Sequence, residues 1–191
     1  MFKHFNIIFL LLFIFCSNNI NAEPFDSMTV VLNLNSNFNN NDFHNYWEPK
    51  TGFEISGRTN FYSGMIELGI TYNKNKSLSI DQPDYNSIYS FVGFGFNYKI
   101  NNSFSNYIGL RMGDYYMDFD DPDIHPELKS EHEFYLGAIT SVQYSLNKRY
   151  AFNLSLEHYK IFTYKRIYLW FVSVGVAYSF DSPKWLKEFL Q

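Results

Sequence analysis

The most constraining feature of this sequence is a two-residue alternation of bulky apolar and small or polar side chains, repeated between Met28 and Phe180. In residues 167–180, one parity carries Trp170, Val172, Val174, Val176, Tyr178 and Phe180, and the other carries Phe171, Ser173, Gly175, Ala177 and Ser179. Because successive side chains of a β-strand point to opposite faces, such a segment predicts a strand with one apolar face. A soluble sheet protein with an aromatic-rich core is the alternative, but long strands with aromatic ends favour a barrel facing lipid.

Eight segments show this pattern, and turns or loops separate them. They are Met28 to Phe38, Lys50 to Phe61, Gly64 to Lys74, Ser87 to Ile100, Phe104 to Asp118, His132 to Leu146, Tyr150 to Phe162 and Ile167 to Phe180. All six prolines (Pro24, Pro49, Pro83, Pro122, Pro126 and Pro183) fall outside them, as strands paired on both sides require. The pattern predicts an all-β fold, an eight-stranded antiparallel up-and-down transmembrane β-barrel, because closure pairs every backbone group within hydrocarbon.

The connections between the segments alternate in length, which predicts an orientation. Residues 62–63, 101–103 and 147–149 form tight turns, whereas residues 39–49, 75–86, 119–131 and 163–166 form the opposite set. Outer-membrane barrels place short turns in the periplasm and longer loops outside. An even strand number then places both chain ends in the periplasm.

The N-terminus has the features of an export signal. Lys3 precedes a short apolar run that ends at Cys16, and Ala22 offers a small residue for cleavage. We therefore expect residues 1–22 to be a signal peptide and residues 23–180 to form the outer-membrane β-barrel. Lipidation at Cys16 is the alternative, although the bulky Phe15 stands before it.

The C-terminal tail and the net charge give two further expectations. Residues 181–191 fit a short amphipathic segment that we expect to lie as a foot on the periplasmic side of the membrane, with a frayed tail as the alternative. Loss of residues 1–22 removes Lys3 and no acid, leaving 14 basic against 19 acidic residues. Without a basic stripe, we expect no nucleic-acid partner.

The inward parity brings ionisable groups together with glycines. Those groups form an expected lumen polar network of Glu54, Arg58, Glu67, Arg111 and Glu157. Pairing across the turn at residues 62–63 sets Arg58 opposite Glu67, and Arg111 can serve Glu157 or Glu54 across the lumen. A gate or proton path is one interpretation. Because eight strands leave room only for side chains, a structural polar plug is the favoured one.

Basic residues also gather near the outer rim. They predict a lipopolysaccharide contact set of Lys74, Lys76, His158, Lys160, Lys165 and Arg166, with randomly placed rim charge as the alternative. The third long loop is acidic, but its spacing does not match a calcium-binding loop. We expect neither a metal site nor a cofactor.

The export signal, the eight alternating strands and the rhythm of turns and loops resemble those of small outer-membrane barrels, such as outer-membrane protein X and the membrane domain of outer-membrane protein A. This resemblance implies a monomer in the outer membrane of a Gram-negative-type bacterium, with a structural or surface-interaction role through its loops. Val176 to Phe180 resembles the segment that the barrel-assembly machinery recognises, displaced inward by the tail. Outer-membrane lipid, lipopolysaccharide and that machinery are the implied partners.

A second resemblance concerns the barrel enzymes that modify lipid A. The deacylase type resembles this chain at His158, the one candidate catalytic residue, but Lys160 stands where the nucleophile is needed and the last strand holds no glutamate. We therefore expect no catalytic site. A lipid A-modifying enzyme and a narrow channel or small-ligand carrier remain the alternative functions.

Overall fold

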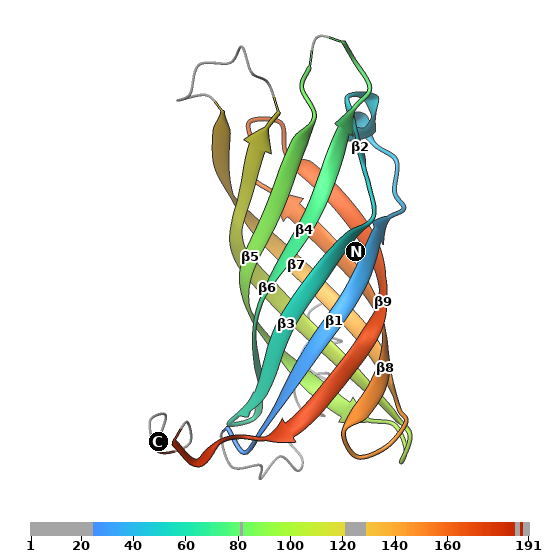
Figure 1. Ribbon diagram of the computed structural model, residues 1–191, viewed down its shortest axis with the longest axis vertical. Helices are drawn as coiled ribbons and strands as arrows, with labels where there is room; N and C mark the ends of the chain where they lie inside the picture. The colour runs from blue at the N-terminus through green and yellow to red at the C-terminus, as the bar shows by residue number, and fades with distance from the viewer. Residues whose placement is uncertain (1–24, 81, 121–128, 186–187, 189–191) are drawn as a thin grey trace, which may run out of the picture.

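The computed structural model describes residues 25–80, 82–120, 129–185 and 188, and these residues are mostly β-structure (Figure 1). The elements are β1 (Ser27–Asn37), the 3₁₀ helix η1 (Asp42–Asn45), β2 (Trp47–Pro49), β3 (Gly52–Phe61), β4 (Gly64–Ser77), β5 (Tyr85–Lys99), β6 (Phe104–Phe119), β7 (Ser130–Ser145), β8 (Tyr150–Ile161) and β9 (Ile167–Asp181). None of the described helical segments is long and apolar enough to cross a bilayer.

The strands form one antiparallel sheet that closes on itself. Each long strand pairs with the next along the chain, β4 pairs with β5, and β1 pairs with β9 from Ser27 opposite Asp181 to Asn37 opposite Phe171. The short strand β2 pairs only with β4, so the barrel wall consists of β1 and β3 to β9. The predicted eight-stranded barrel is confirmed, with strand ends within three residues of those expected from the sequence.

Pro49 lies outside the eight barrel strands, as the sequence predicts, but it belongs to the additional short strand β2. Pro49 ends β2 and lies opposite Asn75 of β4. Because β2 has a neighbouring strand on one side only, the missing N–H of proline leaves no hydrogen bond of the barrel wall unmade. The Lys50 N–H then donates to the Lys74 oxygen at 2.8 Å, so the chain stays attached to β4 until β3 begins.

The alternation in the sequence separates the two faces of the wall. Large apolar side chains of one parity are exposed on the outside, among them Leu34, Leu68, Leu110, Leu154 and Val174. The opposite parity points inward and is buried, including Asn33, Ser141 and Ser173. The barrel therefore has an apolar exterior and a largely polar lumen, the arrangement that a hydrocarbon surrounding requires.

The longer connections gather at one end of the barrel, and the tight turns lie at the other end with the last described part of the chain (Figure 1). At the turn end, Ser182 is buried and its N–H donates to the Asp26 oxygen at 3.0 Å. The expected signal peptide at residues 1–22 lies outside the described residues, as does most of the tail after Trp185. The periplasmic placement of the turn end stays a prediction, and the opposite end, where the longer connections lie, is called the outer end in accordance with that prediction.

Candidate functional site in the lumen and at the outer end

Arg111 of β6 lies at the centre of a buried charge network. Its guanidinium forms one fork with Glu54 (Nη1 to Oε2, 2.8 Å; Nη2 to Oε1, 3.1 Å) and a second with Glu67 (Nε to Oε2, 2.9 Å; Nη2 to Oε1, 2.8 Å). Nη1 also lies 3.2 Å from Glu157 Oε2 and 3.0 Å from the Tyr159 hydroxyl. Arg111 is only 1 % exposed. Two bidentate contacts fix the plane of the guanidinium as well as its position.

Arg58 extends this network toward the turn end. The structure places Arg58 directly opposite Glu67, and Nε donates to Glu67 Oε1 at 2.7 Å. Its guanidinium also lies over the Tyr107 ring, 4.1 Å from the centroid, and reaches Ser141 Oγ at 3.4 Å. Glu67 therefore joins the two arginines, which hold its carboxylate from both sides.

The network contains one more carboxylate than guanidinium groups, and hydroxyl groups surround Glu157. Ser155 and Ser173 each donate to Glu157 Oε1 at 2.9 Å, and the Tyr159 hydroxyl donates to Oε2. Glu54 accepts from Asn33 Nδ2 and Thr71 Oγ1, both at 3.2 Å. Buried charge is tolerated only when paired and hydrogen-bonded, and these donors supply what Arg111 alone does not.

Glycines make the room that Arg111 needs. In the register of the sheet, Arg111 lies between Gly93 of β5 and Gly137 of β7. A Cβ at Gly93 would lie 3.3 Å from Arg111 Cγ and from Glu67 Oε2, and one at Gly137 would lie 2.7 Å from the Tyr159 ring. A narrow lumen accommodates long side chains only where their neighbours are small.

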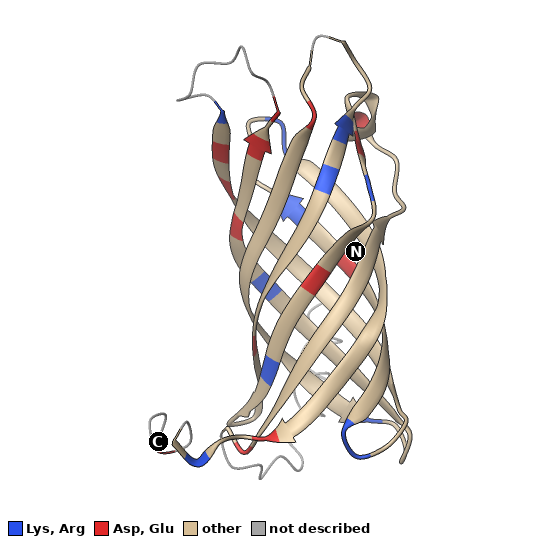
Figure 2. Ribbon diagram, in the orientation of Figure 1, with Lys and Arg blue, Asp and Glu red and all other residues tan. Residues whose placement is uncertain are grey.

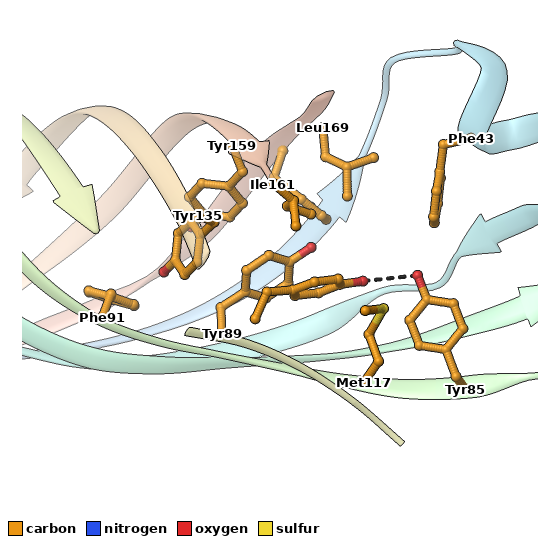
Figure 3. Packing of buried hydrophobic residues seen from close by; sticks show 11 residues of the cluster. Phe43, Tyr85, Tyr89, Phe91, Met117, Tyr135, Tyr159, Ile161 and Leu169 are labelled. Carbon is orange, nitrogen blue, oxygen red and sulfur yellow. Dashed lines mark hydrogen bonds between the residues drawn. The ribbon is translucent and has the colours of Figure 1, made fainter. Parts of the chain in front are cut away.

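An aromatic cluster packs inside the lumen, next to the charge network through Tyr159 and next to the first loop through Phe43. Figure 3 shows how its side chains pack. Tyr89 is its centre, with ring centroids 4.5 Å from Tyr115, 5.1 Å from Tyr159 and 5.3 Å from Tyr135. The hydroxyls of Tyr85 and Tyr115 lie 2.9 Å apart. These rings are at most 2 % exposed, so they pack against one another inside the lumen and are shielded from solvent.

The first outer loop folds over this cluster. Phe43 of η1 is buried and stacks on Trp47 of β2 at 5.7 Å, and Trp47 meets Tyr85 edge-on at 5.6 Å. Trp47 Nε1 donates to the Pro83 oxygen at 3.0 Å. Asn41 caps η1 through the Phe43 N–H and donates to the Tyr168 oxygen at 2.5 Å. Because Asn41 ties this loop to β9, the loop is held over the aromatic cluster. Residues 41–47 of the loop are called the lid.

His158 and Lys160 lie on the outer wall near the outer end of β8. The His158 ring lies 4.4 Å from Trp170 and parallel to Tyr168 at 6.2 Å. The Lys160 ammonium lies 5.0 Å from the Phe162 ring and 5.8 Å from the Tyr168 ring. The site is thus a basic and aromatic shelf, with an ammonium group where a nucleophile would be needed.

The six basic residues expected at the rim do not form one patch. His158 and Lys160 lie on β8 and Lys165 and Arg166 in the connection to β9, whereas Lys74 and Lys76 lie on β4, four strands away around the barrel. Lys74 also has an acidic neighbour, Asp84, at 3.8 Å. Acidic residues mark the outer ends of β6 and β7 (Figure 2). The six basic residues lie at a similar distance from the outer end, but the order of the strands places them on different sides of the barrel.

The sequence reasoning missed an Asp–His pair on the outer wall. His132 Nδ1 lies 2.9 Å from Asp114 Oδ2, and its ring packs on Tyr116 at 4.8 Å. The β6–β7 register places Tyr116 opposite His132, so Asp114, two residues along β6 on the same face, is a diagonal neighbour of His132. That register was the signal that could have revealed the pair. No group of three or more potential metal ligands occurs among the described residues.

The closed antiparallel wall, the apolar exterior and the polar lumen define a transmembrane β-barrel. Residues 7–180 match the model of the outer membrane protein beta-barrel domain, and the chain belongs to that family. The protein is therefore an outer-membrane barrel of the Gram-negative type, embedded in the lipid bilayer. No curated protein matches the chain.

Solved structures of small barrels share this fold. Neisserial surface protein A is 14 % identical with a TM-score of 0.57, covering 81 % of this chain and 95 % of its own. Ail, the attachment invasion locus protein of Yersinia pestis, in complex with the heparin analogue sucrose octasulfate, is 18 % identical with a TM-score of 0.56, covering 83 % and 100 %. The N-terminal barrel of OprF from Pseudomonas aeruginosa is 12 % identical with a TM-score of 0.54, covering 83 % and 100 %. At these identities the likeness establishes the fold alone.

Proposed function

We propose that this barrel is closed to solutes and acts by binding at its outer end, in a structural or surface-interaction role. The observation that most directly supports a closed lumen is the position of the Arg111 guanidinium, which is buried in the lumen and paired with Glu54, Glu67 and Glu157. Opening a pore there would separate buried opposite charges, which costs several kcal/mol. The aromatic cluster and its lid form a second barrier above.

The outer end supports a binding role because its first loop is built as an ordered surface. Hydrogen bonds from Asn37, Asn39 and Asn41 to backbone oxygens of β9 hold the loop in place. An ordered surface loses little conformational entropy when it binds a partner. Ail, a barrel of the same fold, was solved in complex with the heparin analogue sucrose octasulfate, so a barrel of this fold can bind a saccharide ligand.

The β8–β9 hairpin supports lipopolysaccharide as one partner. His158, Lys160, Lys165 and Arg166 place basic groups together at the rim, beside the amphipathic rings of Tyr168 and Trp170. Lysine side chains at this height reach lipid phosphates while their stems stay in apolar surroundings. The barrel acts as a monomer and reaches the membrane through the barrel-assembly machinery.

Catalysis on lipid A finds less support. Along β8 the outward neighbour of His158 is Lys160, and the hydroxyls of Ser155 and Tyr159 point into the lumen, where both bond Glu157. A histidine base needs a nucleophile within hydrogen-bond reach. We therefore propose a binding protein and not a hydrolase.

Proteoliposome swelling tests the closed lumen. Vesicles that carry the purified protein should swell in arabinose no faster than protein-free vesicles, while vesicles that carry a general porin should swell readily. Swelling that rises with the amount of this protein would contradict the proposal.

A further inference from the structure

The outer end carries a hollow that is separate from the charge network and shares only Tyr168 with the basic and aromatic shelf around His158 and Lys160. It has a volume of about 670 Å³ and lies between the first loop, Gln82 and the start of β9. Its lining includes Tyr46, Trp47, Lys165, Arg166 and Tyr168. A volume of this size suits a small ligand.

The floor of the hollow is the outer side of the lid. Trp47 stacks on Phe43, is edge-on to Tyr85 and donates its Nε1–H to Pro83, so its position is fixed before any ligand arrives. Tyr46 is 42 % exposed and offers an accessible ring beside it. Rigid aromatic rings present flat apolar faces, which suit the C–H face of a sugar ring.

The rim of the hollow carries two exposed cations. Lys165 and Arg166 are both exposed, and the ion pairs of the described residues involve neither. One acid, Asp42, also lines the hollow, so bases outnumber acids there. Arginine forks match the geometry of phosphate oxygens.

A third feature points to a hydroxyl-bearing ligand. Gln82 lines the hollow, and its side-chain oxygen Oε1 is buried with no hydrogen-bond partner among the described residues. A buried acceptor without a partner costs free energy, and a rotation of the Gln82 side chain into the hollow would let a ligand hydroxyl supply the missing donor.

We propose that this hollow is a binding site for a phosphorylated saccharide, with the aromatic floor contacting the sugar and Lys165 and Arg166 contacting the phosphate. The proposal rests on the proposed function, because it names a ligand class for the outer end. The saccharide comes either from solution or from the lipopolysaccharide of the same membrane, and both sources offer the same chemistry.

Calorimetric titration of the full-length mature protein in detergent tests the site, with trehalose 6-phosphate as the probe. Trehalose and inorganic phosphate, titrated separately, should each bind about tenfold more weakly or worse, since each lacks half of the contacts. The double variant Lys165→Gln/Arg166→Gln should weaken binding of the probe by about tenfold or more.

Two basic residues at the turn end of the barrel, opposite the hollow, offer a matched control. Lys148→Gln/Arg149→Gln removes the same two charges from the tight turn at residues 147–149 and should leave the affinity for the probe unchanged. If Lys165→Gln/Arg166→Gln fails to fold, Arg166→Gln alone takes its place. Equal loss in the control, no loss in the rim variant, equally tight binding of inorganic phosphate, or no binding at all would overturn the site.

Two further measurements distinguish a soluble saccharide from a lipopolysaccharide sugar, and failure of the saccharide site from failure of the proposed function. Binding of the probe that persists in lipopolysaccharide bilayers indicates a soluble ligand, and binding lost only there indicates that lipopolysaccharide sugar occupies the hollow. Absence of probe binding in detergent with vesicles that do not swell removes the saccharide site and leaves the closed binding barrel standing. Swelling vesicles contradict the proposed function whether or not the probe binds.

Discussion

Arg58 and Glu67 lie directly opposite each other on β3 and β4, and the Nε-to-Oε1 distance of 2.7 Å makes them a buried ion pair. Glu67 also receives two hydrogen bonds from Arg111, so it is shared between two arginines. Removing Glu67 should therefore change the free energy of unfolding by a different amount from removing Arg58.

We predict that Glu67→Met destabilises the barrel more than Arg58→Met. Loss of Glu67 leaves Arg58 without a carboxylate and Arg111 with one fork fewer, whereas loss of Arg58 leaves Glu67 held by Arg111. Breaking a buried pair costs about 3 to 5 kcal/mol, and we expect Glu67→Met at the upper end and Arg58→Met at the lower. Urea unfolding in lipid vesicles measures both free energies.

The exposed pair of Lys50 and Glu48 supplies the control for this prediction. Its side chains are 44 % and 52 % exposed, and Lys50→Met should change the unfolding free energy by no more than about 0.5 kcal/mol. If Arg58→Met and Glu67→Met both behave like Lys50→Met, the network does not stabilise the fold.

The pairing of Arg58 with Glu67 could be derived from the sequence because a two-residue turn fixes the register of both flanking strands. The alternation of side chains likewise determined which residues point into the lumen. The contacts of Arg111 with both Glu54 and Glu67 could not be derived in full. They depend on how β3, β4 and β6 approach across the closed lumen, which no local register specifies.

Lys160 should contribute to stability only in a membrane that contains lipopolysaccharide. Its ammonium lies beside Phe162 and Tyr168 on the outer wall, where it can meet lipid phosphates. We expect Lys160→Gln to lose about 1 kcal/mol of unfolding free energy in lipopolysaccharide bilayers and little in neutral phospholipid. Lys148→Gln, at the turn end, should show no such difference between the two bilayers. Equal effects of the two variants would refute this contact.

His44 should make the lid sensitive to mild acid. Burial lowers the pKa of His44 below its usual 6.5, and Nδ1 accepts from the Asn41 N–H while Nε2 lies 2.8 Å from Asn37 Oδ1. A lowered pKa means that the unfolded loop binds the proton more readily. The stabilisation is therefore complete above pH 6.5 and is lost as the pH falls below it. Titration of the imidazole by NMR should give a midpoint below 6.5, and a midpoint above 6.5 would contradict the buried position.

The orientation of the barrel can be tested with single cysteines. The sequence has one cysteine, Cys16, within the predicted signal peptide, so Tyr164→Cys and Asn102→Cys each give a mature chain with one thiol. Because longer loops face outward, a membrane-impermeant maleimide should label Tyr164→Cys on intact cells and Asn102→Cys only after the outer membrane is opened. The reverse pattern would invert the topology.

The lid and the hollow above it could not be predicted from the sequence. Residues 39–49 show no alternation, and the sequence gives no sign that Phe43 turns inward to cover the cluster. The position of Lys165 and Arg166 beside Trp47 depends on long-range contacts, such as the bond from Asn41 to Tyr168. Periodicity describes strands well, whereas a loop takes its shape from what it packs against.

The most direct test of a closed barrel that binds at its outer end is the ion current through planar bilayers containing the purified protein. Ions are smaller than any sugar, and on the proposed function the buried Arg111 network blocks their passage through the lumen. We predict that wild-type protein adds no current above that of protein-free bilayers at either polarity. Regular current steps that scale with voltage would show an open lumen and contradict the account.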